Sequence, residues 1–182
     1  MSDHLHLNAA QLKAGLPHIR QSPRDNGGLE LIVARPEVNE RVVTEEALLS
    51  PRDGLVGDNW RRRPKVHPDM QLNIMNARAA QLIATSRQRW ALAGDQLYLD
   101  LDLSAENLPP GSRLALGEAI IEVTAEPHTG CKKFVERFGA AAMIFVNSQT
   151  GRDLNLRGIN ARVVQGGRIR VGDVARKLPL PV

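Results

Sequence analysis

The sequence predicts a mainly β domain of the α+β class, in which a barrel-like sheet carries short peripheral helices. Three observations lead to this prediction: many short runs with strand periodicity, Gly and Pro at the breaks between them, and few helical segments. The chain has 182 residues, 42% of them apolar, which suits one domain that buries about 70% of its unfolded surface. Strands and helices alternate too irregularly for a doubly wound fold, and no Gly-rich nucleotide-binding loop is present.

The first half of the chain alternates short strands with Pro- and Gly-rich breaks. Asn8 is a plausible cap for a short helix that ends near Gly15, and prolines then interrupt the chain. Leucine occupies every second position from 97 to 103, so one face of that segment should lie in a core. The predicted elements are strands at 29–35, 41–44, 70–75 and 96–103, a helical turn at 45–49, a basic loop at 61–65, and a helix at 77–85 capped by Asn76.

The second half follows the same pattern and ends in strands. A turn at 109–111 precedes two strands, and Gly139 separates two helices. The predicted elements are strands at 113–116 and 119–124, helices at 131–138 and 140–147, a hairpin of 161–165 with 168–171, and a last strand at 174–177. We therefore expect an N-terminal helical extension over 1–28 and a β-barrel domain over 29–178.

Charge and hydropathy narrow the function classes. Lys and Arg number 24 against 20 Asp and Glu, and this excess of +4 suits an anionic ligand without indicating nucleic acid. The basic loop at 61–65 has no aromatic companion beyond Trp60, which favours a solvated loop over a nucleic-acid interface. No apolar run reaches the ~20 residues that span a bilayer, and the N-terminus does not resemble a secretory signal. We expect a cytoplasmic protein without nucleic-acid or membrane partners.

The single cysteine, Cys131, excludes an intramolecular disulfide, a zinc ribbon and a C-x-x-C redox centre. Thr129 is a good N-cap for the helix that follows, which would place Cys131 in the first turn, where free amides favour an anion. His128, Lys132 and Lys133 add positive charge, which favours a thiolate. Cys131 is therefore either a small buried apolar residue or a working sulfur that acts as nucleophile or soft metal ligand; its cationic neighbours favour the second interpretation.

Two other polar segments are candidate sites. Glu106 and Asn107 follow a strand in a loop, where functional groups often lie, although their local sequence taken alone favours a solvated turn before the Pro109-Pro110 pair. Arg157 could hold a phosphate through its planar guanidinium, and Gly158 would let the backbone approach a ligand. The alternative for this second pair is a surface salt bridge beside a β-bulge.

The chain resembles the MOSC domain family, known from the C-terminal domain of molybdenum cofactor sulfurase and from stand-alone bacterial proteins. The resemblance covers about residues 28–178 and rests on an ordered set of motifs: Gly57-Asp58, DLDLSAEN at 100–107, Cys131, RGINAR at 157–162 and GRIRVGD at 167–173. It implies a β barrel with peripheral helices. It also implies that Cys131 ligates the molybdenum of the molybdenum cofactor or carries sulfur as a persulfide.

The resemblance further implies that several side chains shape the cofactor pocket or lie near its anionic part, namely Glu106, Asn107, His128, Lys132, Arg157 and Gly158. Relatives are implied to reduce N-hydroxylated compounds, so we expect a molybdenum-dependent oxidoreductase or a sulfur transferase. Its partners would be a small-molecule substrate and an electron-donor or sulfur-donor protein. No pyridoxal phosphate is expected, because no aminotransferase-like domain precedes the barrel. Two alternatives stay open: a metal-free persulfide carrier, and a non-catalytic anion-binding barrel.

Overall fold

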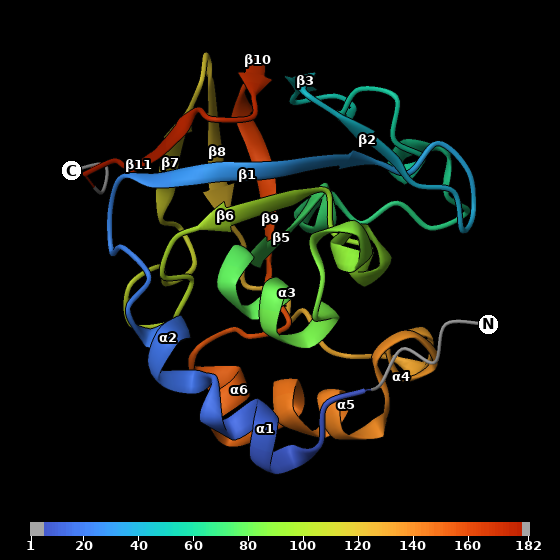
Figure 1. Ribbon diagram of the computed structural model, residues 1–182. Helices are drawn as coiled ribbons and strands as arrows, with labels where there is room; N and C mark the ends of the chain where they lie inside the picture. The colour runs from blue at the N-terminus through green and yellow to red at the C-terminus, as the bar shows by residue number, and fades with distance from the viewer. Residues whose placement is uncertain (1–5, 180–182) are drawn as a thin grey trace.

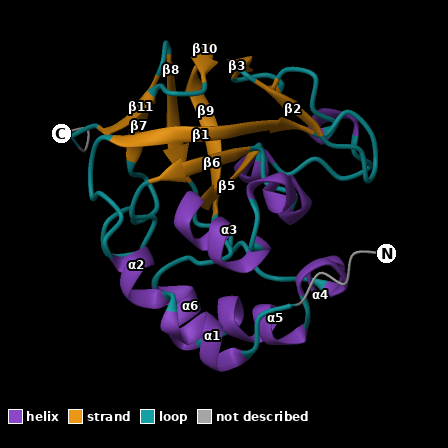
Figure 2. Cartoon of the chain, viewed as in Figure 1, coloured by secondary structure: helices purple, strands orange, loops and turns teal. Residues whose placement is uncertain are grey.

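A β-barrel and a layer of short helices beneath it make up the computed structural model, which describes residues 6–179. Figure 1 shows the strands in the upper part of the molecule and the helices α1, α2, α5 and α6 along its lower side. Figure 2 shows the same separation by element type, with α3 lying between the two parts. The mainly β fold with peripheral helices that the sequence predicts is confirmed.

Seven strands close the barrel in the order β11-β7-β8-β9-β5-β6-β1, because β1 pairs with both β6 and β11. The β5–β6 pair is parallel, and the other ladders among the described residues are antiparallel. The ring strands are β1 (Gly27–Ala34), β5 (Leu72–Asn76), β6 (Leu97–Asp100), β7 (Arg113–Leu116), β8 (Ala119–Val123), β9 (Ile159–Gln165) and β11 (Val174–Lys177).

Four further strands lie outside this ring. One of them extends the barrel sheet beyond β1, and the other three form a small sheet in the order β10-β3-β4. They are β2 (Val42–Thr44), β3 (Glu46–Ser50), β4 (Gly54–Leu55) and β10 (Gly167–Arg170).

Three of the helices begin at a side-chain cap that the sequence provides. Asn8 and Gln11 form a reciprocal capping box, and the Asn76 side chain accepts a 2.9 Å bond from the Ala79 amide. Pro17 lies in the first turn of a helix, where its missing N–H costs nothing. The helices are α1 (Ala9–Ala14), α2 (Leu16–Arg20), α3 (Ala77–Ala84), α4 (Lys132–Phe138), α5 (Ala140–Asn147) and α6 (Gln149–Asp153), with 3₁₀ turns at Trp60–Arg62, Pro68–Met70 and Arg87–Ala93. None of these helices is long and apolar enough to cross a membrane.

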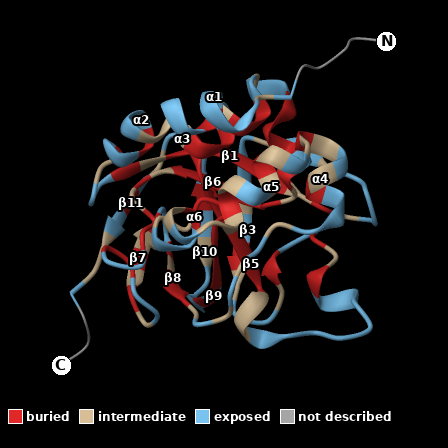
Figure 3. Cartoon of the chain, turned by 90° about the horizontal axis from the view of Figure 1, so that it is seen from below, coloured by how far each residue is buried: buried red, intermediate tan, exposed pale blue. Residues whose placement is uncertain are grey.

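Two apolar clusters correspond to the two parts of the molecule. Leu97 and Leu99 point into the barrel, as the leucine alternation predicts, and both are fully buried. Tyr98, on the opposite face of the same strand, packs with Phe134 and Phe138 in the cluster between barrel and helices. Figure 3 shows buried positions both along the barrel strands and in the helices, with exposed positions at the outer surface. Strand β6 is therefore covered on both faces, and its aromatic residue marks the helix-facing side.

Two sequence predictions about the small sheet are wrong. Residues 46–50 form strand β3 rather than a helical turn, because they pair with β10 along four positions. Residues 161–165 and 168–171 do not form a hairpin. Strand β10 pairs with β3 instead of folding back on β9, and residues 120–123 of β8 pair with β9 along 161–165.

Candidate functional site

Cys131 is exposed, and it is itself the N-cap residue of α4. The prediction that Thr129 caps this helix is wrong: the backbone turns helical two residues later. Phe134 and Phe138 bury the inner face of α4, while the Cys131 side chain makes no capping hydrogen bond. The interpretation of Cys131 as a buried apolar residue is therefore excluded, and its sulfur is reachable from solvent.

The loop before Cys131 is held by two asparagines from other elements. The Asn147 side chain accepts from the Gly130 amide at 2.9 Å and donates to the Gly130 carbonyl at 3.3 Å. Asn160 lies on β9 and donates from Nδ2 to the carbonyl oxygens of Glu126 and Pro127 at 3.0 and 3.3 Å. Side-chain amides thus replace the backbone partners that an irregular loop lacks, and the chain reaches Cys131 along a defined path.

A buried carboxylate, Asp95, lies behind this loop. Its Oδ1 is 2.8 Å from His128 Nε2, and its Oδ2 accepts from Arg157 Nη1 at 2.7 Å. Arg157 also donates to the Ala93 carbonyl, and its guanidinium lies over the Phe134 ring at 5.1 Å. Asp95 is not predictable as a site residue from the sequence, because nothing in its local sequence marks it.

Burial and charge fix the protonation states of this triad. Burial alone would raise the pKa of Asp95, but Arg157 and His128 outweigh it and lower that pKa to about 2. Burial, followed by the nearby Arg157 charge, lowers the pKa of His128 below 6.5. His128 is therefore neutral at neutral pH. Because Nε2 faces a carboxylate, we assign the ring proton to Nε2, which makes it the donor.

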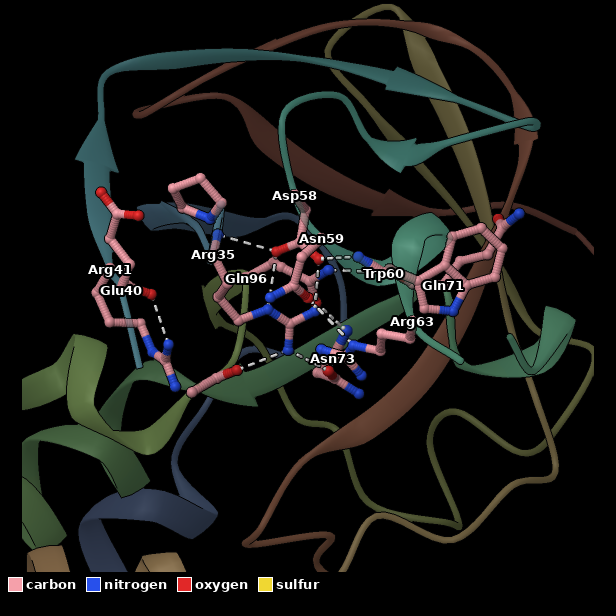
Figure 4. A network of polar contacts seen from close by, with 12 residues as sticks. Arg35, Glu40, Arg41, Asp58, Asn59, Trp60, Arg63, Gln71, Asn73 and Gln96 are labelled. Carbon is pink, nitrogen blue, oxygen red and sulfur yellow. Dashed lines mark hydrogen bonds and ion pairs between the residues drawn. The ribbon is translucent and has the colours of Figure 1, made fainter. Parts of the chain in front are cut away.

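A second buried network centres on Arg35, at the end of the barrel next to Gly94 (Figure 4). Arg35 makes a two-pronged ion pair with Asp58, with N–O distances of 2.8 and 3.0 Å. Its Nη1 donates to Asn73, and Asn73 donates in turn to Asn160 at 2.6 Å. The network therefore runs from Asp58 to the same Asn160 that holds the loop before Cys131.

A cationic cleft of about 550 Å³ opens beside Arg35. Lys133, two residues after Cys131, reaches it from α4 and bonds Asn39 at 3.3 Å. The one acidic lining residue, Glu37, is paired with Arg62. The lining residues are Arg35, Glu37, Val38, Asn39, Arg41, Asn59, Arg63, Pro64, Lys65 and Lys133. Asp58 neutralises Arg35, so four other cations of the lining face one carboxylate that is itself already paired.

The arginine side chains in and around the cleft repel one another. Burial, followed by the charges of Arg137 and Arg35, lowers the pKa of Arg41. Burial and then Arg35 likewise lower the pKa of Arg63. The Nε atom of Arg41 is buried without a hydrogen-bond partner. An anion in this cleft would relieve the repulsion and could satisfy that donor.

The structure places Glu106 and Asn107 away from the cleft. Glu106 is exposed, pairs with Arg24 at 3.0 Å, and lines a separate cavity of about 450 Å³ next to α2. Asn107 is buried and donates to the carbonyls of Arg24 and Asp102. Figures 1 and 3 show α2 and α4 at opposite ends of the helical layer. The structure therefore does not bring this pair to Cys131.

The other predicted residues lie near Cys131 in different roles. Arg157 is buried, pairs with Asp95 and packs over the Phe134 ring, so it stabilises the structure beneath α4. Gly158 lies against the His128 ring. Lys132 is exposed, and its neighbour Lys133 is the lysine that lines the cleft. Arg35 and Arg41 were not predicted as site residues because they stand apart in the loop between β1 and β2, with no basic run around them.

The fold and the site together define a β-barrel domain with an exposed thiol and, two residues further along the chain, a lysine that lines a cationic cleft. The sequence matches the MOSC domain profile over residues 58–176, more than half of the chain, so the protein belongs to the MOSC domain family. The matched span contains Cys131 and Lys133, whereas Arg35 and Arg41 lie before it.

Solved structures share the fold at low sequence identity. A hypothetical protein matches with a TM-score of 0.59 and 21% identity, covering 85% of this chain and 68% of that one. The YuaD protein from Bacillus subtilis matches with a TM-score of 0.63 and 15% sequence identity, and the match covers 84% of this chain and 95% of YuaD. YiiM from Escherichia coli matches with a TM-score of 0.54 and 21% sequence identity, and the match covers 84% of this chain and 70% of YiiM. No curated protein gives a significant sequence match.

Proposed function

We propose that the protein binds the molybdenum cofactor, with the Cys131 thiolate as the protein ligand of molybdenum and the cationic cleft as the site of the pterin phosphate. Membership of the MOSC family supports this proposal in general terms. The observation that carries it is the placement of an exposed thiol two residues before Lys133, which lines a cleft together with Arg41, Arg63 and Lys65.

The residues present fit such a cofactor. A thiolate is a soft ligand suited to a metal that already carries sulfur ligands. The unpartnered Nε of Arg41 and the mutually repelling guanidinium groups suit a dianionic phosphate. Within residues 6–179, no cluster of three His, Cys, Asp or Glu side chains could hold a bare metal ion. The proposal therefore requires the pterin to supply the other metal ligands.

Each part of the site has a task in this proposal. Cys131 would hold the metal, Lys133 and Arg41 would neutralise the phosphate, and Asn147 and Asn160 hold the loop that leads to the exposed thiol. The bound cofactor would supply oxygen-atom transfer, the chemistry by which N-hydroxylated compounds are reduced. The same proposal includes a small-molecule substrate, an electron-donor protein and a cytoplasmic location.

The test compares three quantities in protein purified from a host that makes the cofactor: molybdenum, released pterin and the mass of the Cys131 peptide. We expect molybdenum and pterin in equal, near-stoichiometric amounts. A peptide heavier by one sulfur and reversed by reductant, with neither molybdenum nor pterin present, would replace the proposal with the persulfide carrier. An unmodified peptide without either component would leave only an anion-binding barrel.

A further inference from the structure

Asp95 reaches the chain on one side of Cys131 through a histidine. His128 precedes the cysteine by three residues, and its Nε2 lies 2.8 Å from Asp95 Oδ1. The ring is largely buried, and it packs where Gly158 has no side chain. One oxygen of the carboxylate thus fixes the segment that leads into Cys131.

The second oxygen of Asp95 reaches the chain on the other side of Cys131. Arg157 binds Oδ2 at 2.7 Å, and its guanidinium lies over the ring of Phe134 at 5.1 Å. Phe134 follows Cys131 by three residues and is buried on the inner face of α4. The carboxylate therefore holds, through two different partners, both flanks of the cysteine.

Other observations agree with a support role for this carboxylate. Asp95 is completely buried, while Cys131 is exposed, so the acid acts on the thiol only through intermediaries. Its neighbour Gly94 accepts from Arg35 of the cleft, so the same short segment touches both parts of the site. A buried charge held by two partners is costly to assemble and gives a single defined arrangement.

We propose that Asp95 is a positioning residue for Cys131, which it fixes by holding His128 and, through Arg157, Phe134. The inference rests on the proposed function in one respect only, that Cys131 is the working sulfur. Its test does not require molybdenum, so its failure and the failure of the proposed function can be told apart.

A nitroxide spin label on Cys131, the only cysteine in the chain, reports the local order of the site in metal-free protein. The electron paramagnetic resonance spectrum of the labelled wild-type protein gives the reference mobility of this exposed position, whose backbone is held on both sides. Asp95→Asn keeps the size of the side chain and removes its charge. We expect it to increase the mobile fraction relative to that reference, at a temperature where circular dichroism shows folded protein.

Glu122→Gln is the matched control, because Glu122 is also one carboxylate held by two partners, Arg113 at 2.8 Å and Arg162 at 2.6 Å. It should leave the spectrum unchanged even if it lowers stability. If Asp95→Asn does not fold, His128→Asn breaks one arm alone and should give a partial increase in mobility. A wild-type spectrum in a folded Asp95→Asn or His128→Asn variant, or equal mobility in Glu122→Gln, would overturn the inference.

Discussion

The His128 imidazole packs against Gly158, and a Cβ at position 158 would stand only 3.0 Å from its Cδ2 atom. The same Cβ would collide with the Ile74 carbonyl oxygen of strand β5. Gly158 also has a φ of +114°, which other residues rarely adopt. The glycine of the RGINAR motif therefore makes room for the ring that Asp95 holds.

Gly158→Ala should destabilise the protein by more than the ~1–2 kcal/mol expected from a positive φ alone, because the new methyl group also strikes backbone. Gly172→Ala is the control: its φ is +94°, and nothing lies within 4 Å of the added Cβ. Urea unfolding of both variants gives the comparison. Equal losses would show that the contact with His128 and Ile74 does not constrain position 158.

The stability of the protein should fall as the pH falls below 6.5, because His128 resists protonation in the folded protein and accepts a proton when unfolded. His128→Gln can keep an N–H facing Asp95 and should flatten the dependence of the unfolding free energy between pH 7 and 5. A second loss, of about 2 kcal/mol, should follow between pH 3.8 and about 2, as Asp95 takes up its proton. An unaltered slope in His128→Gln would contradict the first assignment.

Two adjacent lysines allow the cleft to be compared with the nearby surface, because Lys133 lines the cleft and Lys132 does not. Lys133→Glu should lower retention of a phosphate-bearing pterin about tenfold or more, because a charge-assisted contact contributes ~1.5–3 kcal/mol. Lys132→Glu makes the same charge change one residue away and should have a smaller effect, since Lys132 does not line the cleft. Pterin fluorescence after gel filtration measures both. A larger loss in Lys132→Glu would move the phosphate site away from the cleft.

The Arg35–Asp58 pair should contribute far more to stability than the exposed Arg24–Glu106 pair. Asp58→Asn leaves a buried guanidinium without its counterion and should cost ~3–5 kcal/mol. Glu106→Ala should change the unfolding free energy by less than ~0.5 kcal/mol, since both partners are solvated. Denaturant titration decides between them, and similar losses would show that Arg35 does not depend on Asp58 for its charge balance.

Sequence patterning predicted what depends on local chemistry. The leucine alternation identified strand β6, Asn76 identified the start of α3, and the flanking lysines made Cys131 a candidate. These signals work because periodicity and capping act within a few residues.

The remaining features depend on contacts between distant segments. Asp95 meets His128 and Arg157 from 33 and 62 residues away, and no local pattern encodes that meeting. Strand β3 is extended because β10 pairs with it across the fold. The cleft brings basic residues at 35, 41, 63, 65 and 133 together, although only 61–65 forms a basic run.

The most direct test of the proposed function is the molybdenum content per chain of wild-type protein and of Cys131→Ser, both purified from one cofactor-producing host. The account predicts close to one molybdenum per chain in the wild-type protein and its loss in Cys131→Ser, with Lys132→Ala as a folded surface control that keeps the metal. Molybdenum retained at the wild-type level in Cys131→Ser would contradict the assignment of Cys131 as the ligand.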